Sequence, residues 1–278
     1  MILLDGKALS NKLYDTLKEN PERANTKLII LTFGEDLASN VYVRNKLKAC
    51  EYVGLKYEHI ILDENMSVEE FDRYIFKLIN ENVINYSAPN NHLGIILQLP
   101  APQKFVELFN ENINPYFDVD GFGSRNRELL AFYGNPINYP ATPKGIMTML
   151  EYYNIDIEGK HVVIIGRSDI VGKPLAVMML NKNATVTICH SKTENLETIT
   201  KTADILVVAI GKPKFINATH IKDGVTIIDV GINRTENGLC GDVDFEDVKD
   251  KCYAITPVPG GVGPMTVYSL IENTCKNS

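Results

Sequence analysis

Residues 162–174, with the sequence VVIIGRSDIVGKP, constrain the fold of this chain more than any other segment. An apolar, β-branched run leads into Gly166, and Gly172 follows six residues later with Pro174 close behind. This order predicts a strand, a tight turn and a helix start, where backbone N–H groups and the helix dipole can bind a diphosphate. Ser168 replaces the second glycine of G-x-G-x-x-G and Gly172 comes one position late, so the spacing alone indicates a dinucleotide site only weakly.

The next predicted strand favours NADP over NAD. It covers residues 184–189 and is followed by Ser191 and Lys192, where NAD-binding units usually carry an acidic residue for the adenine ribose. An acid would repel a ribose 2′-phosphate, whereas Arg167 and Ser191 could bind one. The alternative is that Arg167 and Lys192 are solvated loop cations beside an ordinary βαβ crossover.

Composition and charge limit the class of protein. The chain has 278 residues, enough for one large or two ordinary domains, and its 45% hydrophobic and 23% charged content is typical of globular proteins. A net charge of −7 argues against nucleic acid or an anionic membrane as the main partner. The N-terminal sequence lacks a signal-peptide pattern, and five scattered cysteines without C-x-x-C are typical of a cytoplasmic protein with reduced thiols and no metal site.

Hydrophobic periodicity predicts two blocks of alternating strands and helices. In the first block we expect strands at 27–33, 57–61 and 94–99 and helices near 9–17, 39–53, 71–78 and 105–110. In the second we expect a helix at 142–153 and strands at 161–165, 184–189, 205–209, 226–230 and 253–255. Residues 114–143, rich in proline, glycine and asparagine, are expected to connect the domains.

The predicted fold class is therefore α/β with two domains and a cleft between them. An N-terminal βα domain with a parallel sheet would cover residues 1–118 and be completed by a C-terminal helix at 263–278. A Rossmann-type NADP domain would cover residues 140–256.

Lys46 is the first candidate for chemistry. It lies four residues after Tyr42 on a predicted helix, so the two side chains share one stripe. A lysine on an inward stripe is partly desolvated, which would lower its pKa and make it an acid or base near neutrality. The more common alternative is a boundary lysine whose stem is buried and whose amine reaches water.

Three further segments could contribute to a site. Gln98 ends a buried strand at the edge where open α/β sheets bind ligands, although its amide could equally bond to backbone. Asp118 and Asp120 precede Gly121, and acids in such turns more often bond to their own backbone. The glycine-rich loop at 257–264 could let backbone approach a flat ligand, or it could simply start a helix.

Seven motifs, in order and across nearly the whole chain, resemble the methylenetetrahydrofolate dehydrogenase/cyclohydrolase family of the bifunctional FolD type. They are ASNVYVRNKLKACEYVG (38–54), GIILQLPAP (94–102), DVDGF (118–122), TPKGI (142–146), GRSDIVGKP (166–174), NATVTICHSKT (183–193) and ITPVPGGVGPMT (255–266). The resemblance implies a cytoplasmic, usually homodimeric enzyme of one-carbon metabolism and purine biosynthesis. Such an enzyme oxidises 5,10-methylenetetrahydrofolate with NADP and hydrolyses the methenyl product to 10-formyltetrahydrofolate.

The resemblance also implies roles for individual residues. Lys46 would be the central catalytic residue, with Tyr42 stacking on the pterin-side rings, Gln98 setting the lysine's charge and Asp120 holding the pterin's amino edge. The folate site would include Pro259, Gly260 and Gly261, and the nucleotide would contact Gly166, Arg167, Ser168, Gly172, Ser191 and Ile232. Hydride removal creates a delocalised cation, so a desolvated lysine able to release its proton suits the reaction better than a permanent charge.

Three positions depart from the family pattern. Phe117 stands where a lysine is common, Ala141 replaces a common cysteine and Glu128 replaces a common glycine, while Asn126 is kept. Because Phe117 precedes the Asp118–Asp120 turn, a dehydrogenase with weak or absent cyclohydrolase activity is one alternative. The others are an α/β dehydrogenase for a small hydroxy or amino acid and a dinucleotide-binding redox sensor that is not an enzyme.

Overall fold

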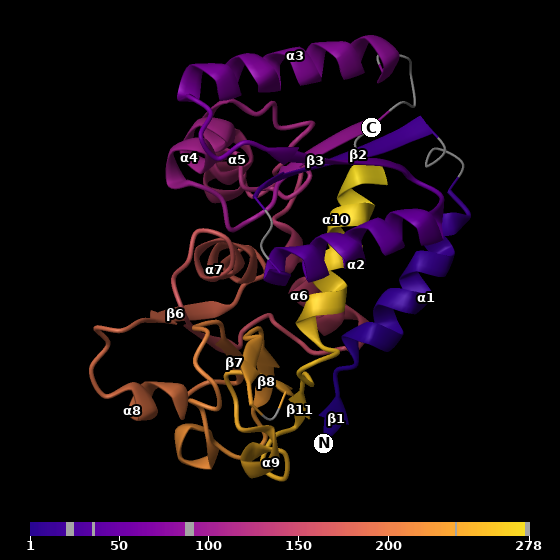
Figure 1. Cartoon of the computed structure of the whole chain (residues 1–278). Helices are drawn as coiled ribbons and strands as arrows, with labels where there is room; N and C mark the ends of the chain where they lie inside the picture. Colours follow the sequence, from indigo (N-terminus) through magenta and orange to yellow (C-terminus); the bar gives the residue numbers. More distant parts are fainter. Residues whose placement is uncertain (21–24, 35–36, 87–91, 237, 276–278) are drawn as a thin grey trace. The chain divides into compact units, whose positions relative to one another are not determined.

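The computed structural model describes residues 1–20, 25–34, 37–86, 92–236 and 238–275 (Figure 1). The chain divides into two compact units, and the predicted two-domain α/β organisation is confirmed. Unit 1 contains Met1–Asn11 and Thr142–Thr266, and unit 2 contains Lys12–Ala141 and Val267–Ser278. These boundaries differ from the expected 1–118 and 140–256, because the first eleven residues belong to unit 1.

The N-terminal residues join unit 1 through strand pairing. Strand β1 (Ile2–Leu3) pairs in parallel with β11 (Ala254–Ile255). The Tyr153 hydroxyl accepts a hydrogen bond from the Asp5 backbone N–H at 3.0 Å, and so fixes the chain just before helix α1 (Gly6–Lys18). A two-residue strand has no periodicity to read, which is why the sequence did not reveal it.

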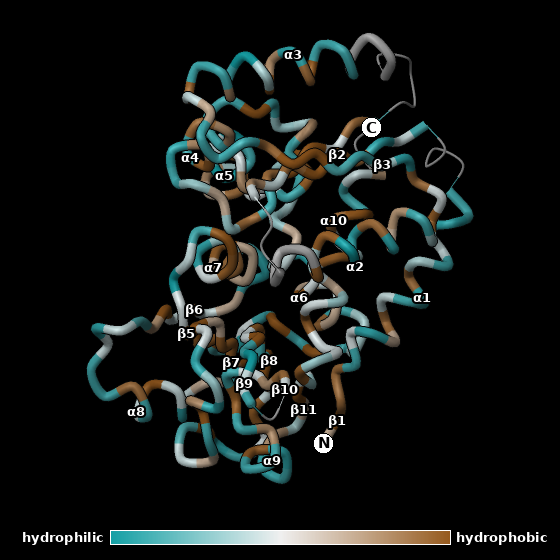
Figure 2. Tube along the Cα trace, viewed as in Figure 1, coloured by the Kyte–Doolittle hydropathy of each residue, from teal (hydrophilic) through white to brown (hydrophobic). Residues whose placement is uncertain are grey.

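Unit 2 contains a three-stranded parallel sheet of order β3-β2-β4. The central strand β2 (Thr26–Phe33) pairs with both β3 (Lys56–Leu62) and β4 (His92–Leu97). Strand β4 is buried along its whole length, and β2 along nearly all of it, as expected for parallel strands covered on both faces. In Figure 2, β2 is accordingly hydrophobic, whereas α3 alternates between hydrophilic and hydrophobic residues along its length.

Aromatic side chains fix two helices of unit 2 on this sheet. The helices that lie wholly within unit 2 are α2 (Leu37–Val53), α3 (Val68–Tyr86), α4 (Gln103–Asn112) and α5 (Ser124–Tyr133). Phe33 of β2 stacks on Phe105 of α4 with ring centroids 4.6 Å apart, and Phe71 of α3 contacts both rings. A capping box starts α3, because the Ser67 N–H donates to Glu70 and the Glu70 N–H donates to the Ser67 hydroxyl.

Residues 114–143 do not form the irregular connection that we expected. They belong to unit 2 up to Ala141, and they contain helix α5, which ends at Gly134 in the left-handed conformation (φ 71°). The prolines that suggested a linker lie on either side of this helix, as do all the asparagines of the segment except Asn126.

Unit 1 is built on a six-stranded sheet of order β1-β11-β8-β7-β5-β6, in which every strand pair is parallel. Its other strands are β5 (His161–Ile165), β6 (Thr185–Cys189), β7 (Ile205–Val208) and β8 (Thr226–Asp229). Strands β6 and β7 lie on opposite sides of β5, so the strand order reverses between β5 and β7. That switch point is where doubly wound sheets bind dinucleotides.

The remaining elements of unit 1 cover or extend this sheet. They are α6 (Ala141–Tyr152), α7 (Gly172–Leu180), α8 (Leu196–Thr200), the 3₁₀ helix η2 (Ala218–His220), α9 (Phe245–Val248), the antiparallel pair β9 (Asn233–Thr235) and β10 (Gly238–Cys240), and the start of α10 (Val262–Cys275). The unit boundary falls within α10 at residue 267, so most of the predicted C-terminal helix belongs to unit 2. None of the described helices is long and apolar enough to cross a membrane.

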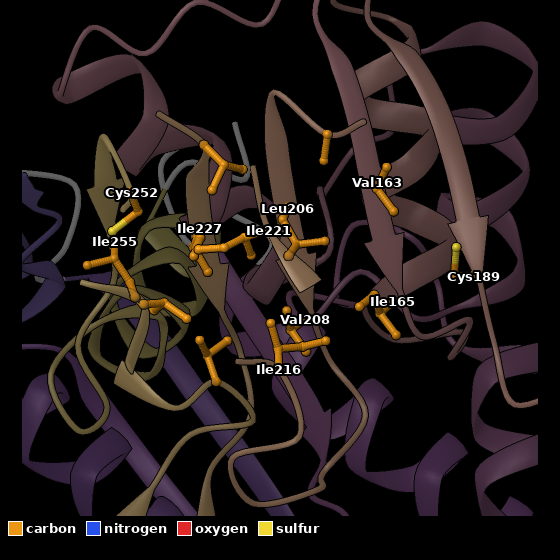
Figure 3. Close-up of a cluster of buried hydrophobic side chains, with 14 residues drawn as sticks. Val163, Ile165, Cys189, Leu206, Val208, Ile216, Ile221, Ile227, Cys252 and Ile255 are labelled. Atoms are coloured by element: carbon orange, nitrogen blue, oxygen red, sulfur yellow. The ribbon is translucent and has the colours of Figure 1, made fainter. Parts of the chain in front are cut away.

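A cluster of buried side chains connects five strands of the unit 1 sheet, β5, β6, β7, β8 and β11 (Figure 3). Val163 and Ile165 of β5, Leu206 and Val208 of β7, Ile227 of β8 and Ile255 of β11 contribute to it. Alternate residues of each strand point to the same face, so this cluster holds the carboxyl ends of neighbouring strands in register.

Candidate active site

Lys46 is buried on helix α2, with 6% of its surface exposed. Its Nζ donates a hydrogen bond to Oε1 of Gln98 at 2.7 Å. The amine is therefore held inside unit 2, and the boundary arrangement with its nitrogen in water does not occur.

Gln98 directly follows β4 and is fixed from both sides. Its backbone N–H donates to the Leu31 carbonyl at 2.8 Å, which extends the ladder between β4 and β2 by one residue. Its Nε2 donates to the Leu99 carbonyl at 2.8 Å, so that Oε1 faces Lys46. The amide thus makes both of the interactions that the sequence left open: its nitrogen bonds to backbone and its oxygen to the lysine.

The two carboxylates of the DVDG turn have different surroundings. Asp118 is buried and accepts hydrogen bonds from the backbone N–H groups of Gly121, Phe122 and Gly123 at 3.0, 3.2 and 2.7 Å. This is the backbone-bonding role that is common for acids in turns. Asp120 is partly buried and lies close enough to Lys46 for each charge to shift the pKa of the other.

Burial dominates the electrostatics of this group. It lowers the pKa of Lys46 below its ordinary value, and the nearby carboxylate of Asp120 opposes that shift. It likewise raises the pKa of Asp120, opposed by the charge of Lys46. The structure therefore brings together Lys46, Gln98 and Asp120 as an amine, an amide and a carboxyl with perturbed proton affinity.

Tyr42 lies one turn before Lys46 on α2 and is 41% exposed. Burial raises the pKa of its hydroxyl, so the phenol stays protonated at neutral pH. An exposed ring beside a buried amine could stack on a flat ligand. That role stays a prediction.

In unit 1, the predicted glycine turn after β5 is tightly wound. Gly166 has φ 121°, and a Cβ at this position would overlap the carbonyl oxygen of Ala209 in the loop after β7. A Cβ at Gly172 would overlap the carbonyl oxygen of Gly166. Both glycines are therefore required for close backbone packing at the switch point.

Ser168 caps the helix that follows this turn. Its hydroxyl accepts from the N–H groups of Val171 at 3.2 Å and Gly172 at 3.4 Å, and its carbonyl accepts from Lys173. We had expected the N–H groups at this helix start to face a diphosphate, but three of them are bonded to Ser168. The serine at the second glycine position thus supplies the helix cap itself.

Arg167 and Ser191 occupy equivalent positions on neighbouring strands. Ile165 and Cys189 are partners in the β5–β6 register, and each strand ends there. Arg167 and Ser191 therefore each lie two residues beyond a strand end, and both are exposed. A guanidinium and a hydroxyl at adjacent strand ends fit a ribose phosphate group.

The other predicted contacts also follow strand ends of unit 1. Ile232 comes three residues after β8 and is 41% exposed. Pro259, Gly260 and Gly261 follow β11, and the Gly260 carbonyl accepts from the Lys7 backbone N–H at 2.8 Å. Gly260 has φ 109°, which favours glycine. The assignment of this loop to the folate site stays a prediction.

The sequence analysis missed two aspartates of unit 1, Asp229 and Asp242. Both are buried near the carboxyl ends of β7 and β8 and accept hydrogen bonds from several loop N–H groups. An acid at the end of the apolar run TIID is the signal that could have identified the first. Among the described residues, no group of histidine, cysteine, aspartate and glutamate side chains could hold a metal ion.

A glycine turn at the switch point of a parallel sheet, together with an exposed guanidinium and hydroxyl at the adjacent strand ends, defines the class of NAD(P)-binding enzymes. Comparison with known proteins identifies the family. Residues 4–120 match the catalytic domain of tetrahydrofolate dehydrogenase/cyclohydrolase, and residues 140–278 match its NAD(P)-binding domain. The chain therefore belongs to the tetrahydrofolate dehydrogenase/cyclohydrolase family, as the motifs indicated.

Individual relatives resemble the chain over almost its whole length. The bifunctional protein FolD of Agathobacter rectalis is 48% identical, covering 98% of this chain and 96% of that protein. The crystal structure of bifunctional FolD from Campylobacter jejuni has a TM-score of 0.91 and 43% identity, covering 100% of this chain and 98% of that one. The methylenetetrahydrofolate dehydrogenase-cyclohydrolase of Trypanosoma brucei, complexed with NADP and an inhibitor, has a TM-score of 0.87 and 32% identity, covering 98% and 95%.

Proposed function

We propose that this chain oxidises 5,10-methylenetetrahydrofolate with NADP and then hydrolyses 5,10-methenyltetrahydrofolate to 10-formyltetrahydrofolate. The observation that carries the proposal is the buried hydrogen bond between Lys46 and Gln98. It places an amine of lowered pKa in a protected site of a protein whose family performs both steps.

The first step requires a site that tolerates a positive charge on the substrate. NADP, when bound, accepts a hydride from the one-carbon bridge and leaves the methenyl cation. A neutral Lys46 does not repel that cation, and Asp120 supplies compensating negative charge when ionised. Tyr42 would stack on the pterin-side rings, and the partly buried Asp120 carboxyl would bond to the pterin's amino edge.

The second step adds water to the methenyl carbon. A neutral amine at Lys46 can accept a proton from the attacking water, and the resulting ammonium can return it to the departing ring nitrogen. The C–O bond forms as the bond from the methenyl carbon to N5 breaks, and one proton is released overall. Gln98 keeps the amine in place in both protonation states, because Oε1 accepts from either form.

The residues of unit 1 fit NADP. Arg167 and Ser191 would hold the ribose 2′-phosphate, Gly166 and Gly172 would allow the turn to approach the diphosphate, and the exposed Ile232 would contact the nicotinamide end. Ser168 would hold the turn in shape through its cap on α7.

The test is a folate-dependent assay on the purified chain. We expect NADPH to form only when methylenetetrahydrofolate is present, and the methenyl chromophore to decay faster than by spontaneous hydrolysis. Lys46→Met should reduce the hydrolysis rate by roughly 10²–10⁴-fold. Lys48→Met, an exposed lysine on the same helix, is the matched control and should leave the rate unchanged.

The alternatives give distinct results in this assay. A methenyl chromophore that accumulates and decays only spontaneously would indicate a dehydrogenase alone. Reduction of NADP without folate would indicate a small hydroxy or amino acid substrate. Absence of turnover with every folate tested, together with unaltered nucleotide binding in Lys46→Met, would indicate a redox sensor.

We also propose a cytoplasmic homodimer that supplies 10-formyltetrahydrofolate to purine biosynthesis. Family membership supports these assignments. Light scattering coupled to gel filtration should give twice the mass of the 31.1 kDa chain.

A further inference from the structure

Asp229 ends strand β8 with its carboxylate enclosed by backbone. It is 3% exposed and accepts hydrogen bonds from the N–H groups of Gly231, Asp242 and Val243 at 3.1, 3.0 and 2.9 Å. The side chain thus ties the loop that follows β8 to the chain that follows β10.

Asp242 is fully buried and makes a second set of such bonds. Its carboxylate accepts from the backbone N–H groups of Ile210, Gly211 and Lys212 at 2.8, 2.9 and 2.8 Å. It also accepts from Nδ2 of Asn233 at 2.8 Å. One buried side chain therefore fixes both the loop after β7 and the end of the loop after β8.

Two glycines make room for these carboxylates reciprocally. A Cβ at Gly241 would overlap the Asp229 carboxylate, and a Cβ at Gly231 would overlap the Asp242 carboxylate. Gly241, which precedes Asp242, thus accommodates the side chain of Asp229. Gly231, two residues after Asp229, accommodates the side chain of Asp242. Such mutual fit leaves the two loops little freedom to rearrange.

The loop after β7 and the loop after β8 lie on the same side of the switch point. Arg167 and Ser191 follow β5 and β6, on the side that receives the adenine ribose in doubly wound sheets. Residues 210–212 and 231–233 follow β7 and β8, on the other side. By the same topology, that side is left for the nicotinamide half of the dinucleotide.

We propose that Asp242, supported by Asp229, is a positioning residue that shapes the nicotinamide half of the NADP site. The inference rests on the proposed function in taking NADP as the ligand. N–H groups donate hydrogen bonds to both carboxylates, and the carboxylate of Asp242 accepts from four of these donors at once. An uncharged amide of the same shape would turn donors toward donors, and the loop after β7 would lose its fixed conformation.

The test compares Asp242→Asn with Asp204→Asn, and it measures NADP binding directly by calorimetry. Asp204 also accepts a backbone hydrogen bond, from His161 at 2.8 Å, but it precedes β7 and so lies at the opposite edge of the same sheet. We expect Asp242→Asn to raise the Kd for NADP by at least about tenfold, as for loss of one charged hydrogen bond. We expect Asp204→Asn to lower the melting temperature without changing that Kd.

Two further measurements separate positioning from general damage. In Asp242→Asn the KM for NADP should rise while kcat at saturating NADP is retained, and hydrolysis of methenyltetrahydrofolate without NADP should stay within about twofold of the parent. Asn233→Ala removes one of the four donors and keeps the carboxylate. It should also raise the Kd for NADP, but by a smaller factor than Asp242→Asn.

An unchanged Kd for NADP in both Asp242→Asn and Asn233→Ala would overturn the proposal. So would a proportional loss of NADP binding and cofactor-free hydrolysis in Asp242→Asn, because that pattern indicates misfolding throughout. If Asp242→Asn does not fold, Asn233→Ala decides. Failure of the proposed function would appear separately, as absence of folate turnover in the unaltered chain.

Discussion

Lys46 and Gln98 meet across two elements that are distant in sequence, with Nζ of the helix residue 2.7 Å from Oε1 of the residue that ends β4. A hydrogen bond of this length in a buried place fixes the amine whether or not it carries a proton. The charge of Lys46 is then set by its surroundings: burial favours the neutral form and Asp120 favours the ammonium. Variants of either neighbour should therefore change the pH dependence of catalysis in a defined direction.

Gln98→Glu should shift the pH profile of hydrolysis upward. A carboxylate in contact with Nζ stabilises the ammonium, raises the pKa of Lys46 and reduces the neutral fraction at pH 7. We expect the rate at pH 7 to fall by roughly 10–100-fold and the acidic limb to move to higher pH. Gln103→Glu, which alters an exposed glutamine of α4, is the control and should leave the profile unchanged. An unchanged profile in Gln98→Glu would contradict the assignment of Lys46 as the titrating base.

Asp120→Asn should shift the same limb in the opposite direction. The carboxylate of Asp120 raises the pKa of Lys46 against the effect of burial, so its removal lowers that pKa further. The neutral amine then persists to lower pH, and the acidic limb of the hydrolysis profile follows it. The KM for the folate should also rise if Asp120 makes the bond to the pterin that we propose. A limb that moves to higher pH would exclude the coupling between the two groups.

Asp118→Asn should reduce stability and leave the pH profile in place. The carboxylate accepts from three backbone N–H groups and from Nδ2 of Asn126 at 2.9 Å. An amide would leave one or two of these donors unpaired, at a cost of roughly 2–4 kcal/mol in the free energy of unfolding. Urea titration measures that cost, with Asp120→Asn as the comparison two residues away. Equal loss of stability in both variants would mean that the two aspartates do not differ in role.

The contrast between Asp118 and Asp120 shows where the sequence ceases to be informative. The strands, the parallel sheets and the tight turn after β5 follow from apolar runs and glycines, which report on local conformation and burial. Both acids sit in the same DVDG turn, and the local pattern assigns them the same backbone role. What separates them is that the charges of Asp120 and of Lys46 on α2 influence each other, an interaction over more than 70 residues that no local pattern encodes.

Pairing between distant segments explains the other differences. Strand β1 exists because Ile2 and Leu3 pair with Ala254 and Ile255, and neither pair of residues has a period of its own. Asp242 is similar, because its role depends on loops that follow β7 and β8. Ser168 shows the same limit: it lies in the turn after β5, but only the folded geometry reveals that its hydroxyl caps α7.

Arg167→Ala should separate NADP from NAD. The guanidinium is exposed beside the strand end that also carries Ser191, where it can pair with the 2′-phosphate that NAD lacks. We expect the Kd for NADP to rise by roughly 10–100-fold and the Kd for NAD to stay unchanged. Lys182→Ala removes an exposed positive charge after α7 and is the control for net charge. Equal weakening of both nucleotides in Arg167→Ala would place the arginine elsewhere on the cofactor.

Asp229 should make the stability of the ligand-free protein depend on pH. Burial raises the pKa of its carboxyl from 3.8 to about 7, helped by the nearby Asp242 and opposed by its backbone hydrogen bonds. Between these values the folded chain holds a proton that the unfolded chain has released. The contribution of the Asp229 carboxyl to the free energy of unfolding is therefore fully present below pH 4 and is lost as the pH rises through about 7.

Melting temperatures from pH 4 to 8 test this dependence, because Asp229→Asn cannot titrate and should lack it. The difference in the free energy of unfolding between the parent and Asp229→Asn should change by up to about 1.4 kcal/mol per pH unit. Lys214, Cys240, Asp244 and Glu246 line a cavity together with Asp229. Asp204 gives a pH dependence of stability with the opposite sign. The hydrogen bond from Lys222 lowers the pKa of Asp204, so the stabilisation from this carboxylate is lost as the pH falls. Parallel curves for the parent and Asp229→Asn would mean that this carboxyl is ionised throughout the range.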